Sequence, residues 1–210
     1  MQLYAITNRR LFARSEDLMK QVVLWASSGV EYVQIREKDL AMVDLAALAE
    51  GIVGAVRSVA ASTRVLLNGP AEVAAATGCD GVHLTAGLPG LAIQDARLAM
   101  SRVVADPIIS VSCHTLAEIE HARDDGAVLA IFAPVFEKRL ESETMPGQGL
   151  EALAAACKVA APIPVFALGG ITAGNAESCV HAGATGIAAI RLFASSDWLS
   201  LRGSLSDPRG

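Results

Sequence analysis

The sequence lacks paired cysteines. Its four cysteines, Cys79, Cys113, Cys157 and Cys179, are widely spaced, and none belongs to a CxxC pair. This excludes the common zinc-ribbon and thioredoxin-type motifs, which need two cysteines separated by two residues. Without a secretion signal, reduced thiols in the cytoplasm are expected, and we interpret all four side chains as small, buried apolar groups.

Basic clusters and long apolar runs are also missing. The chain has 17 Lys and Arg against 22 Asp and Glu, a formal net charge of −5, and no run of basic residues that would mark a nucleic-acid surface. The N-terminal residues MQLYAITNRR enter a strand-like run directly, without the segments of a signal peptide. The apolar run Val128–Phe136 is too short to span a bilayer. We therefore expect a cytoplasmic protein that contacts neither nucleic acid nor membrane.

What the chain does have is a repeated pattern of glycine followed by a short apolar run. The pattern occurs in SSGVEYVQIR, TGCDGVHL, DGAVLAIFAPV and AGATGIAAI. Glycine is the usual residue just past the end of a helix, and a short continuous apolar run suits a strand buried on both faces of a parallel sheet. The pattern predicts eight strands, at Gln2–Ile6, Tyr32–Arg36, Arg64–Asn68, Gly81–Leu84, Ile108–Ser112, Leu129–Ala133, Pro164–Leu168 and Gly186–Ile190.

Helical patterns separate most of these strands. One example is TLAEIEHARDDG, in which Thr115 and Glu118 have the spacing of a capping box. Strict alternation of strands and helices indicates a parallel sheet, and the first strand lacks the glycine-rich loop of a doubly wound dinucleotide-binding fold. We therefore predict an α/β protein with a single-domain (β/α)8 TIM barrel over residues 1–194. Residues 195–210 are expected to form a C-terminal helix fragment and a disordered tail.

Polar residues gather where the predicted strands end, which is where (β/α)8 barrels place their sites. QIREKD ends the second strand and brings together Gln34, Arg36, Glu37 and Lys38. Because side chains alternate along a strand, Arg36 and Lys38 are expected to face the barrel mouth while Glu37 points away. Two such cations suit a phosphate or pyrophosphate group. A salt-bridged strand terminus is the alternative interpretation.

Two further strand ends carry candidate chemistry. Gly169 and Gly170 follow the seventh strand, where backbone N–H groups can approach a phosphate closely, although a simple tight turn is the alternative. His114 follows the fifth strand directly, and the ordinary pKa of a histidine, about 6.5, suits proton transfer. The alternative for His114 is a loop histidine that caps the next helix. For His83, a structural role is at least as well supported as a functional one.

Several segments resemble, in order, those of the thiamine phosphate synthase/TenI superfamily: YVQIREKD, CDGVHL, ISVSCHTLAEIE, APVF, IPVFALGGIT and AGATGIAAI. The resemblance runs from about Gln2 to Phe193. It implies a (β/α)8 barrel and one of two activities. Thiamine phosphate synthase joins a hydroxymethylpyrimidine pyrophosphate to a thiazole phosphate with magnesium. The TenI-type thiazole tautomerase aromatises a carboxylated thiazole phosphate by moving a proton without a metal.

Departures from the synthase pattern bear on the choice between these activities. In synthases the third strand typically ends in Asn-Asp-Arg, and the Asp helps to hold magnesium, whereas this chain has Asn68-Gly69-Pro70. A second acidic ligand normally follows GVHLG, whereas this chain reads TAGLP there and has no carboxylate until Asp95. The loop PVFEKRLESETMPGQGLE also resembles the tautomerase form more closely. Against the tautomerase, QIREK is the intact synthase pyrophosphate motif, and Arg191 stands where both groups commonly have Ser.

We therefore predict a metal-independent thiazole tautomerase of thiamine biosynthesis. Its general acid/base would be His114, which matches the tautomerase histidine, a residue that also occurs in some synthases. No cofactor is expected, and magnesium would be needed only by the alternative, a thiamine phosphate synthase with an altered metal site. A third interpretation is a non-catalytic barrel that binds a thiamine-related ligand. The partner is a phosphorylated thiazole, and the sequence leaves a homo-oligomer open. The predicted substrate-binding residues are Gln34, Arg36, Lys38, Asn68, Ser112, Gly169, Gly170, Ala189 and Ile190.

Overall fold

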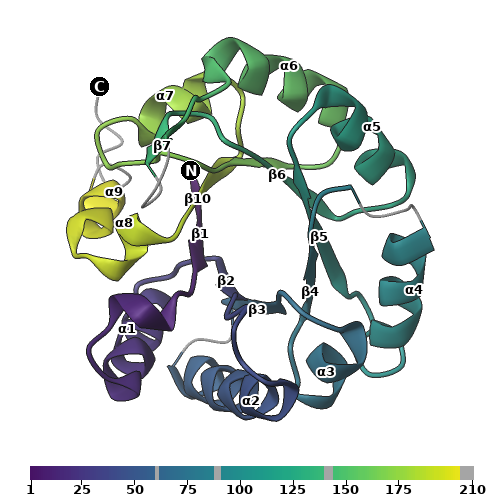
Figure 1. Ribbon diagram of the computed structural model, residues 1–210, viewed down its shortest axis with the longest axis vertical. Coiled ribbons are helices and arrows are strands. Elements are labelled where there is room, and N and C mark those ends of the chain that lie inside the picture. The colour runs from purple at the N-terminus through teal and green to yellow at the C-terminus, as the bar shows by residue number, and fades with distance from the viewer. Residues whose placement is uncertain (60–61, 88–90, 140–143, 204–210) are drawn as a thin grey trace.

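Eight parallel strands close into a barrel in the computed structural model, which describes residues 1–59, 62–87, 91–139 and 144–203. The strands follow one another around the barrel in chain order, and β10 pairs with β1 to close it. Figure 1 shows the strands as an inner ring with helices outside them. The strand bounds are β1 Gln2–Ile6, β2 Tyr32–Ile35, β3 Arg64–Leu67, β4 Gly81–Leu84, β5 Ile108–Cys113, β6 Leu129–Phe132, β9 Val165–Ala167 and β10 Gly186–Ala189.

Helices connect the barrel strands and cover the outside of the barrel, so the predicted single-domain (β/α)8 fold is confirmed. The expected capping box is present, because Thr115 Oγ1 accepts the Glu118 N–H while the Glu118 carboxylate accepts the Thr115 N–H. No described helix is both long and apolar enough to cross a membrane. The α-helices are α1 Ser15–Ser27, α2 Met42–Val59, α3 Ala71–Ala76, α4 Leu91–Met100, α5 Leu116–Asp124, α6 Gly149–Ala160, α7 Ala176–His181, α8 Arg191–Ala194 and α9 Ser200–Gly203, with 3-10 turns η1 Arg9–Leu11 and η2 Asp197–Leu199.

Apolar side chains form two separate cores, one inside the barrel and one between the barrel and its helices. Aromatic rings fill the inner core, where Tyr4 stacks on Tyr32 at 5.4 Å and both rings lie 5.5 Å from Phe166. The outer core takes alternate residues of the same strands, such as Leu3 and Val33. Because each strand is buried on both sides, its sequence is a continuous apolar run without strict alternation.

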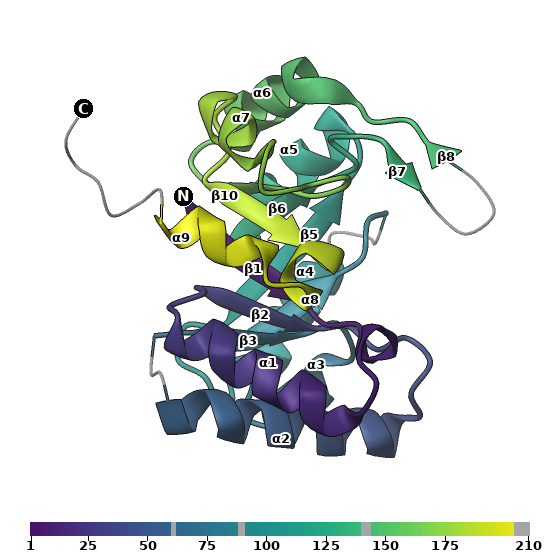
Figure 2. The ribbon, with the colours of Figure 1, turned by 90° about the vertical axis from the view of Figure 1, so that its left-hand side faces the viewer.

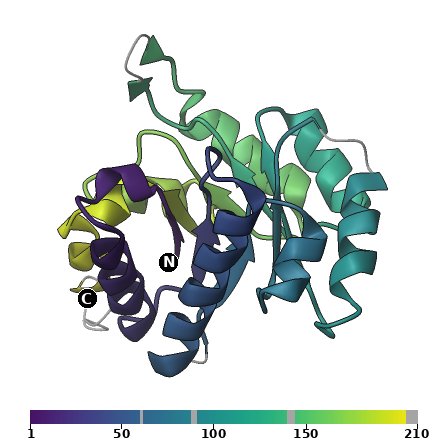
Figure 3. The same ribbon diagram turned by 60° about the horizontal axis from the view of Figure 1, so that its bottom comes forward.

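The predicted strands match the barrel strands to within one residue at each end. Several elements were not predicted from the sequence: the turn η1, the helices α4 and α8, and the hairpin of β7 (Lys138–Arg139) and β8 (Thr144–Met145). Figures 2 and 3 show this hairpin projecting away from the barrel. Its strands have two residues each, too few to show a periodicity. The expected disordered tail includes residues 204–210, which lie outside the described residues.

The cysteines agree with their interpretation as buried groups in three of four cases. Cys79, Cys113 and Cys179 are buried, Cys157 is half-buried, and all four are free thiols. Burial raises the pKa of the Cys113 thiol to about 12 and raises the pKa values of the other three thiols to about 11. All four side chains therefore stay protonated at neutral pH, which suits packing better than nucleophilic chemistry.

The glycines of the repeated pattern have two distinct roles. Gly81, at the start of β4, pairs with Ile108 of β5, and a Cβ added there would lie 1.9 Å from the Ile108 carbonyl oxygen. Glycine is required at this position by the close approach of two backbones. The glycines that follow helices instead have positive φ values, as the pattern predicts; they are Gly29 (75°), Gly78 (75°), Gly126 (89°) and Gly183 (105°).

Asp80 precedes β4, at the end of the barrel away from the strand termini that form the mouth. Its carboxylate accepts hydrogen bonds from the Val65 N–H (2.7 Å) and from the guanidinium groups of Arg57 (2.7 Å) and Arg64 (3.3 Å). Only 12% of its side chain is exposed, so water replaces these bonds poorly. We expect Asp80→Asn to lower the free energy of unfolding by about 2 kcal/mol, as measured by urea denaturation. The matched variant Asp124→Asn, on the surface, should keep the wild-type midpoint; equal losses in both would contradict this role for Asp80.

Candidate active site

His114 follows β5 at the mouth of the barrel and is exposed. Its ring Nδ1 lies 2.8 Å from the carbonyl oxygen of Ala133, just after β6. A carbonyl oxygen only accepts hydrogen bonds, so Nδ1 carries the hydrogen in the neutral ring and Nε2 is an unprotonated acceptor. Nε2 has no hydrogen-bond partner among the described residues. This is the arrangement of a base that is open to a ligand.

Two residues that the sequence did not mark as part of the site surround His114: Glu118, predicted only as part of a capping box, and Gln148. The Glu118 carboxylate accepts the backbone N–H of His114 at 2.5 Å. Gln148, just before α6, donates from Nε2 to the same Ala133 carbonyl oxygen at 2.9 Å. The alternative that His114 caps the next helix is wrong, because Thr115 is the capping residue of α5. The ring of His114 is therefore not used by the helix that follows it.

The turn of Gly169 and Gly170 after β9 packs against the segment that follows β6. Its two residues have φ values of 100° and 64°, and a Cβ at Gly169 would lie 2.6 Å from Pro134 Cβ. A Cβ at Gly170 would lie 2.5 Å from the carbonyl oxygen of Glu137. This close packing explains both glycines without a ligand, which is what the tight-turn interpretation states. Phosphate binding by the turn stays a prediction.

Glu37 is a correction to the sequence prediction. It was expected to point away from the mouth, but it is buried, and its carboxylate accepts hydrogen bonds from Thr7 Oγ1 (2.7 Å) and the Arg9 N–H (2.9 Å) in the loop after β1. Strand β2 ends at Ile35, so the alternation rule no longer applies at residue 37. Glu37 therefore ties the first two strand ends together.

Arg36 and Lys38 border a cavity of about 170 Å³ at the mouth, beside the loop after β1. Arg10 supplies a third cation to the cavity wall. Asp39 lies 2.5 Å from Arg9 and 2.8 Å from Arg10, and these guanidinium groups hold the pKa of its carboxyl well below the usual range. Within the described residues, neither Arg36 nor Lys38 joins this ion-pair network. The end of β2 is thus followed by an ion-pair network around Asp39, as the salt-bridge interpretation predicts. Arg36 and Lys38 lie outside that network and are available to bind an anion.

Three other predicted residues lie around His83, whose ring is buried inside the barrel. Ser112 Oγ is 2.8 Å from His83 Nε2, and Asn68 donates from Nδ2 to the His83 carbonyl oxygen at 3.1 Å. Gln34 is buried, and its Oε1 accepts the Tyr4 hydroxyl at 3.1 Å. The sequence left the role of His83 open; its place on β4 gave no sign that it would connect to the end of β5.

The end of β10 completes the mouth. Ala189 is buried, and Ile190 is half-buried against the inner core. Arg191 begins α8 and is exposed. After the neighbouring strand β9, Asn175 fixes the Gly169–Gly170 turn by donating from Nδ2 to the Gly170 carbonyl oxygen at 3.0 Å. The predicted residues therefore share one end of the barrel, although ligand contacts by any of them stay a prediction.

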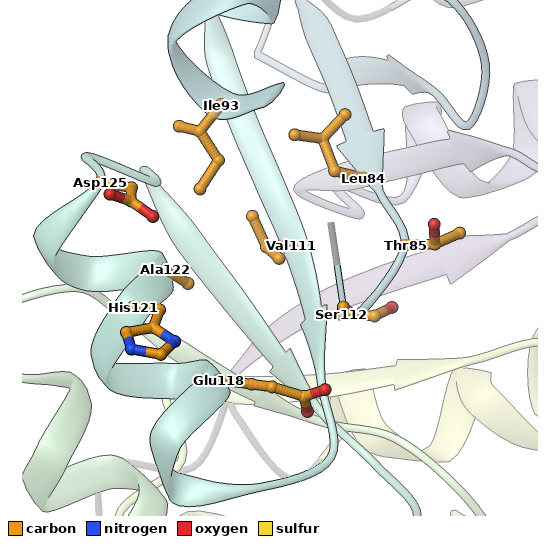
Figure 4. Close-up of a pocket in the computed structure, with 10 residues that line it drawn as sticks. Leu84, Thr85, Ile93, Val111, Ser112, Glu118, His121, Ala122 and Asp125 are labelled. Atoms are coloured by element: carbon orange, nitrogen blue, oxygen red, sulfur yellow. The ribbon is translucent and has the colours of Figure 1, made fainter. Parts of the chain in front are cut away.

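A second cavity, of about 190 Å³, lies outside the barrel near α4 and α5 (Figure 4). Leu84, Ile93 and Val111 supply its apolar part, with Glu118 at its margin. Figure 4 shows Val111 directed toward the helices and Ser112 on the opposite side of β5. Of the predicted site residues, Ser112 alone is among those that line this cavity.

The structure is a (β/α)8 barrel in which Arg36, Lys38 and His114 lie at the C-terminal ends of the strands, where enzymes of this fold have their active sites. Comparisons identify its relatives. A model of the family described as thiamine monophosphate synthase matches residues 3–193. The chain therefore belongs to the thiamine monophosphate synthase family.

Individual relatives agree with this assignment. A Geobacter sulfurreducens protein named "Putative thiamine-phosphate synthase" is 36% identical over 90% of this chain and 84% of its own length. The thiamine-phosphate synthase of Roseiflexus sp. is 31% identical over 90% of this chain and 76% of its own. The solved thiamine phosphate pyrophosphorylase of Pyrococcus furiosus aligns over 97% of this chain and 93% of its own, with 26% identity and a TM-score of 0.77. These names favour the synthase alternative, because each of them names a synthase or a pyrophosphorylase and none names a tautomerase.

Proposed function

We propose that this chain is a thiazole tautomerase within the thiamine monophosphate synthase family, acting on a carboxylated thiazole phosphate without a metal ion. The observation that carries the proposal is the hydrogen bond from His114 Nδ1 to the Ala133 carbonyl oxygen. It leaves Nε2 as the atom that takes a proton from one ring position and returns it to another. The imidazolium formed in between is stabilised by the same carbonyl oxygen through Nδ1–H.

The residues at the synthase metal positions do not fit magnesium, which prefers carboxylate oxygens. Gly69 has no side chain, and a Cβ there would already touch Leu45 and Leu67 at 3.3 Å. Two carboxylates close to the mouth already accept hydrogen bonds from the protein. Glu37 accepts one from the Thr7 hydroxyl just after β1, and Glu118 accepts one from the Thr115 N–H at the start of α5. No cluster of three or more metal-ligating side chains occurs in the described part of the chain. We therefore assign no step to a metal ion.

The remaining predicted residues have roles in binding under this proposal. The backbone N–H groups of Gly169, Gly170, Ala189 and Ile190 would hold the phosphate. Arg36 and Lys38 would neutralise the carboxylate of the substrate, since both are available at the mouth. A metal would not be needed to balance the charge of the substrate.

Thiamine phosphate synthase is the second candidate. It is favoured by the names of the relatives and by the intact series Gln34, Arg36 and Lys38, which resembles the synthase pyrophosphate motif. This reaction joins the pyrimidine to the thiazole phosphate and releases pyrophosphate. It requires a set of metal ligands that differs from the one the resemblance implies, because Gly69 replaces the acid.

The test is to assay the purified chain with the carboxythiazole phosphate tautomer, with and without EDTA. We expect conversion to the aromatic tautomer at rates that agree within about twofold in EDTA and in added magnesium, because the chemistry is proton transfer alone. In parallel, the two synthase precursors are supplied with magnesium. Thiamine phosphate formation that EDTA abolishes, without tautomerisation, would establish the synthase instead. Binding of thiazole phosphate without either turnover would establish the non-catalytic alternative.

A further inference from the structure

A chain of hydrogen bonds runs from the inner core to the mouth. The Tyr4 hydroxyl donates to Gln34 Oε1 at 3.1 Å and lies 3.5 Å from Ser110 Oγ. Ser110 Oγ is 2.9 Å from His83 Nδ1, and His83 Nε2 is 2.8 Å from Ser112 Oγ. Tyr4 and Ser110 are fully buried, whereas Ser112, the last residue of this hydrogen-bonded series, is half-buried. The imidazole of His83 is therefore the link between the interior and the mouth.

His83 is a neutral imidazole at physiological pH. Burial, assisted by the positive charges of Arg36 and Lys38, lowers its pKa to about 3. A neutral ring donates a hydrogen bond from one nitrogen and accepts one at the other. The two serine hydroxyls bound to His83 must therefore behave differently, one as a donor and one as an acceptor.

The distances identify which serine donates. The Tyr4 hydrogen is used by Gln34, whose amide oxygen only accepts. The single hydrogen of Ser110 then has two possible acceptors, His83 Nδ1 at 2.9 Å and the Tyr4 oxygen at 3.5 Å, and the second distance exceeds the normal range for O–H···O bonds. We therefore assign Ser110 as the donor to Nδ1, which is the shorter of its two contacts. It follows that Nε2–H donates to Ser112, whose own hydrogen is left for another acceptor.

We propose that His83 is a positioning residue that acts through Ser112, turning the Ser112 hydroxyl into a hydrogen-bond donor toward a ligand at the mouth. Figure 4 shows Ser112 on the side of β5 opposite to Val111, although Ser112 also contributes to the margin of the outer cavity. Ser112 lies near the end of β5 and precedes His114, which follows that strand, by two residues. The ligand atom beside Ser112 is then an acceptor, in the ring or in the carboxylate of the thiazole. This inference depends on the proposed function in one respect only, the identity of the ligand.

The first test is the tautomer of His83, read by long-range 1H–15N NMR of protein labelled in histidine and assigned by loss of the signals in His83→Gln. We expect a neutral ring protonated at Nε2, unchanged from about pH 8 to about pH 5 because the ring is buried. Tyr4→Phe should leave the tautomer as it is, since the 3.5 Å contact between Tyr4 and Ser110 is too long to compete with the 2.9 Å contact between Ser110 and His83 Nδ1. Protonation at Nδ1 would overturn the proposal. This measurement needs neither substrate nor turnover.

The second test compares two polar replacements of His83 by calorimetric binding of thiazole phosphate and of its carboxylated form. The amide nitrogen of Gln can replace Nε2, whereas that of Asn replaces Nδ1. We expect His83→Gln to bind within about threefold of wild type and His83→Asn and Ser112→Ala each to lose about tenfold, the usual value for a hydrogen bond to a charged or polar ligand atom. Loss with only the carboxylated form places the acceptor in the carboxylate, and loss with both places it in the ring.

Coupling between the two positions separates positioning from general destabilisation. The double variant His83→Asn/Ser112→Ala should bind no more than about twofold more weakly than either single variant, because both remove the same hydrogen bond. Multiplying losses, or equal losses for Gln and Asn at residue 83, would overturn the proposal. Absence of tautomerase turnover with this binding pattern intact would reject the proposed function and leave the role of His83 standing.

Discussion

Replacing His114 with Asn is expected to lower kcat for thiazole tautomerisation by about 10²–10⁴-fold, the usual contribution of a positioned acid/base. Asn can still donate a hydrogen bond toward the Ala133 carbonyl oxygen, which His114 Nδ1 contacts at 2.8 Å. It has no atom that takes up and returns a proton near neutral pH. The measurement is the rate of conversion of the carboxythiazole phosphate tautomer at saturating substrate.

Binding serves as the internal control for this variant. Thiazole phosphate should bind His114→Asn within about threefold of wild type, because the proton is transferred only in the transition state. His181→Asn is the matched surface replacement; His181 is exposed on α7, and its contact with Glu177 is a marginal 4.0 Å. A wild-type rate in His114→Asn would remove His114 from the mechanism. A parallel loss of binding and kcat would assign it to holding the substrate.

Gly81→Ala is expected to reduce the free energy of unfolding by about 3 kcal/mol or more, since a Cβ inserted against a backbone cannot be accommodated by a side-chain rotation. The added Cβ would lie 1.9 Å from the Ile108 carbonyl oxygen and 2.7 Å from its carbonyl carbon. To relieve the overlap, β4 must separate from β5, and the barrel loses part of its closed pairing. Urea denaturation followed by circular dichroism measures the loss.

Gly54→Ala gives the matched control in the opposite direction. Gly54 is exposed within α2, and nothing lies within 4 Å of a Cβ added there. The same chemical change should therefore stabilise the protein by about 0.5–1 kcal/mol, through the higher helix propensity of Ala. If Gly81→Ala cost no more than a typical surface substitution, the close backbone approach would not be the reason for glycine at residue 81.

The barrel was predictable because its strands are short apolar runs punctuated by glycines. In a parallel barrel all strand ends with the same polarity meet at one mouth. His114 and the Gly169–Gly170 turn could therefore be placed together from the sequence alone. The same reasoning placed Arg36 and Lys38 at the mouth, although it could not show which of the nearby acids would be bound to arginine.

Other contacts were not predictable because they join residues that are far apart in the chain. The burial of Glu37 depends on Thr7 and on the loop after β1, and strand alternation carries no information once β2 has ended. The orientation of His114 depends on a carbonyl after β6 that Gln148 also contacts. No local pattern encodes such a shared acceptor.

Family membership and reaction are separate questions for this chain. The family match covers residues 3–193, because the matched positions include the apolar strands and the turns that build the barrel. The difference between a synthase and a tautomerase rests on a few mouth positions, such as Gly69. The barrel alone therefore does not determine the reaction, since one fold supports many chemistries.

The short segment after β6 forms an anchor at the start of its loop. In the anchor, the Val135 and Phe136 N–H groups bond to the Leu168 and Gly169 carbonyl oxygens. A Cβ at Gly147 would come within 2.5 Å of the Val135 carbonyl oxygen, so a larger residue at position 147 would overlap the backbone of the anchor. The departure of the sequence from the synthase pattern begins at Glu137, where this anchor ends. The anchor contacts all lie before residue 137 or at Gly147 and the turn after β9, so a substitution at Lys138 or Arg139 leaves the position of the Gly169–Gly170 turn unchanged.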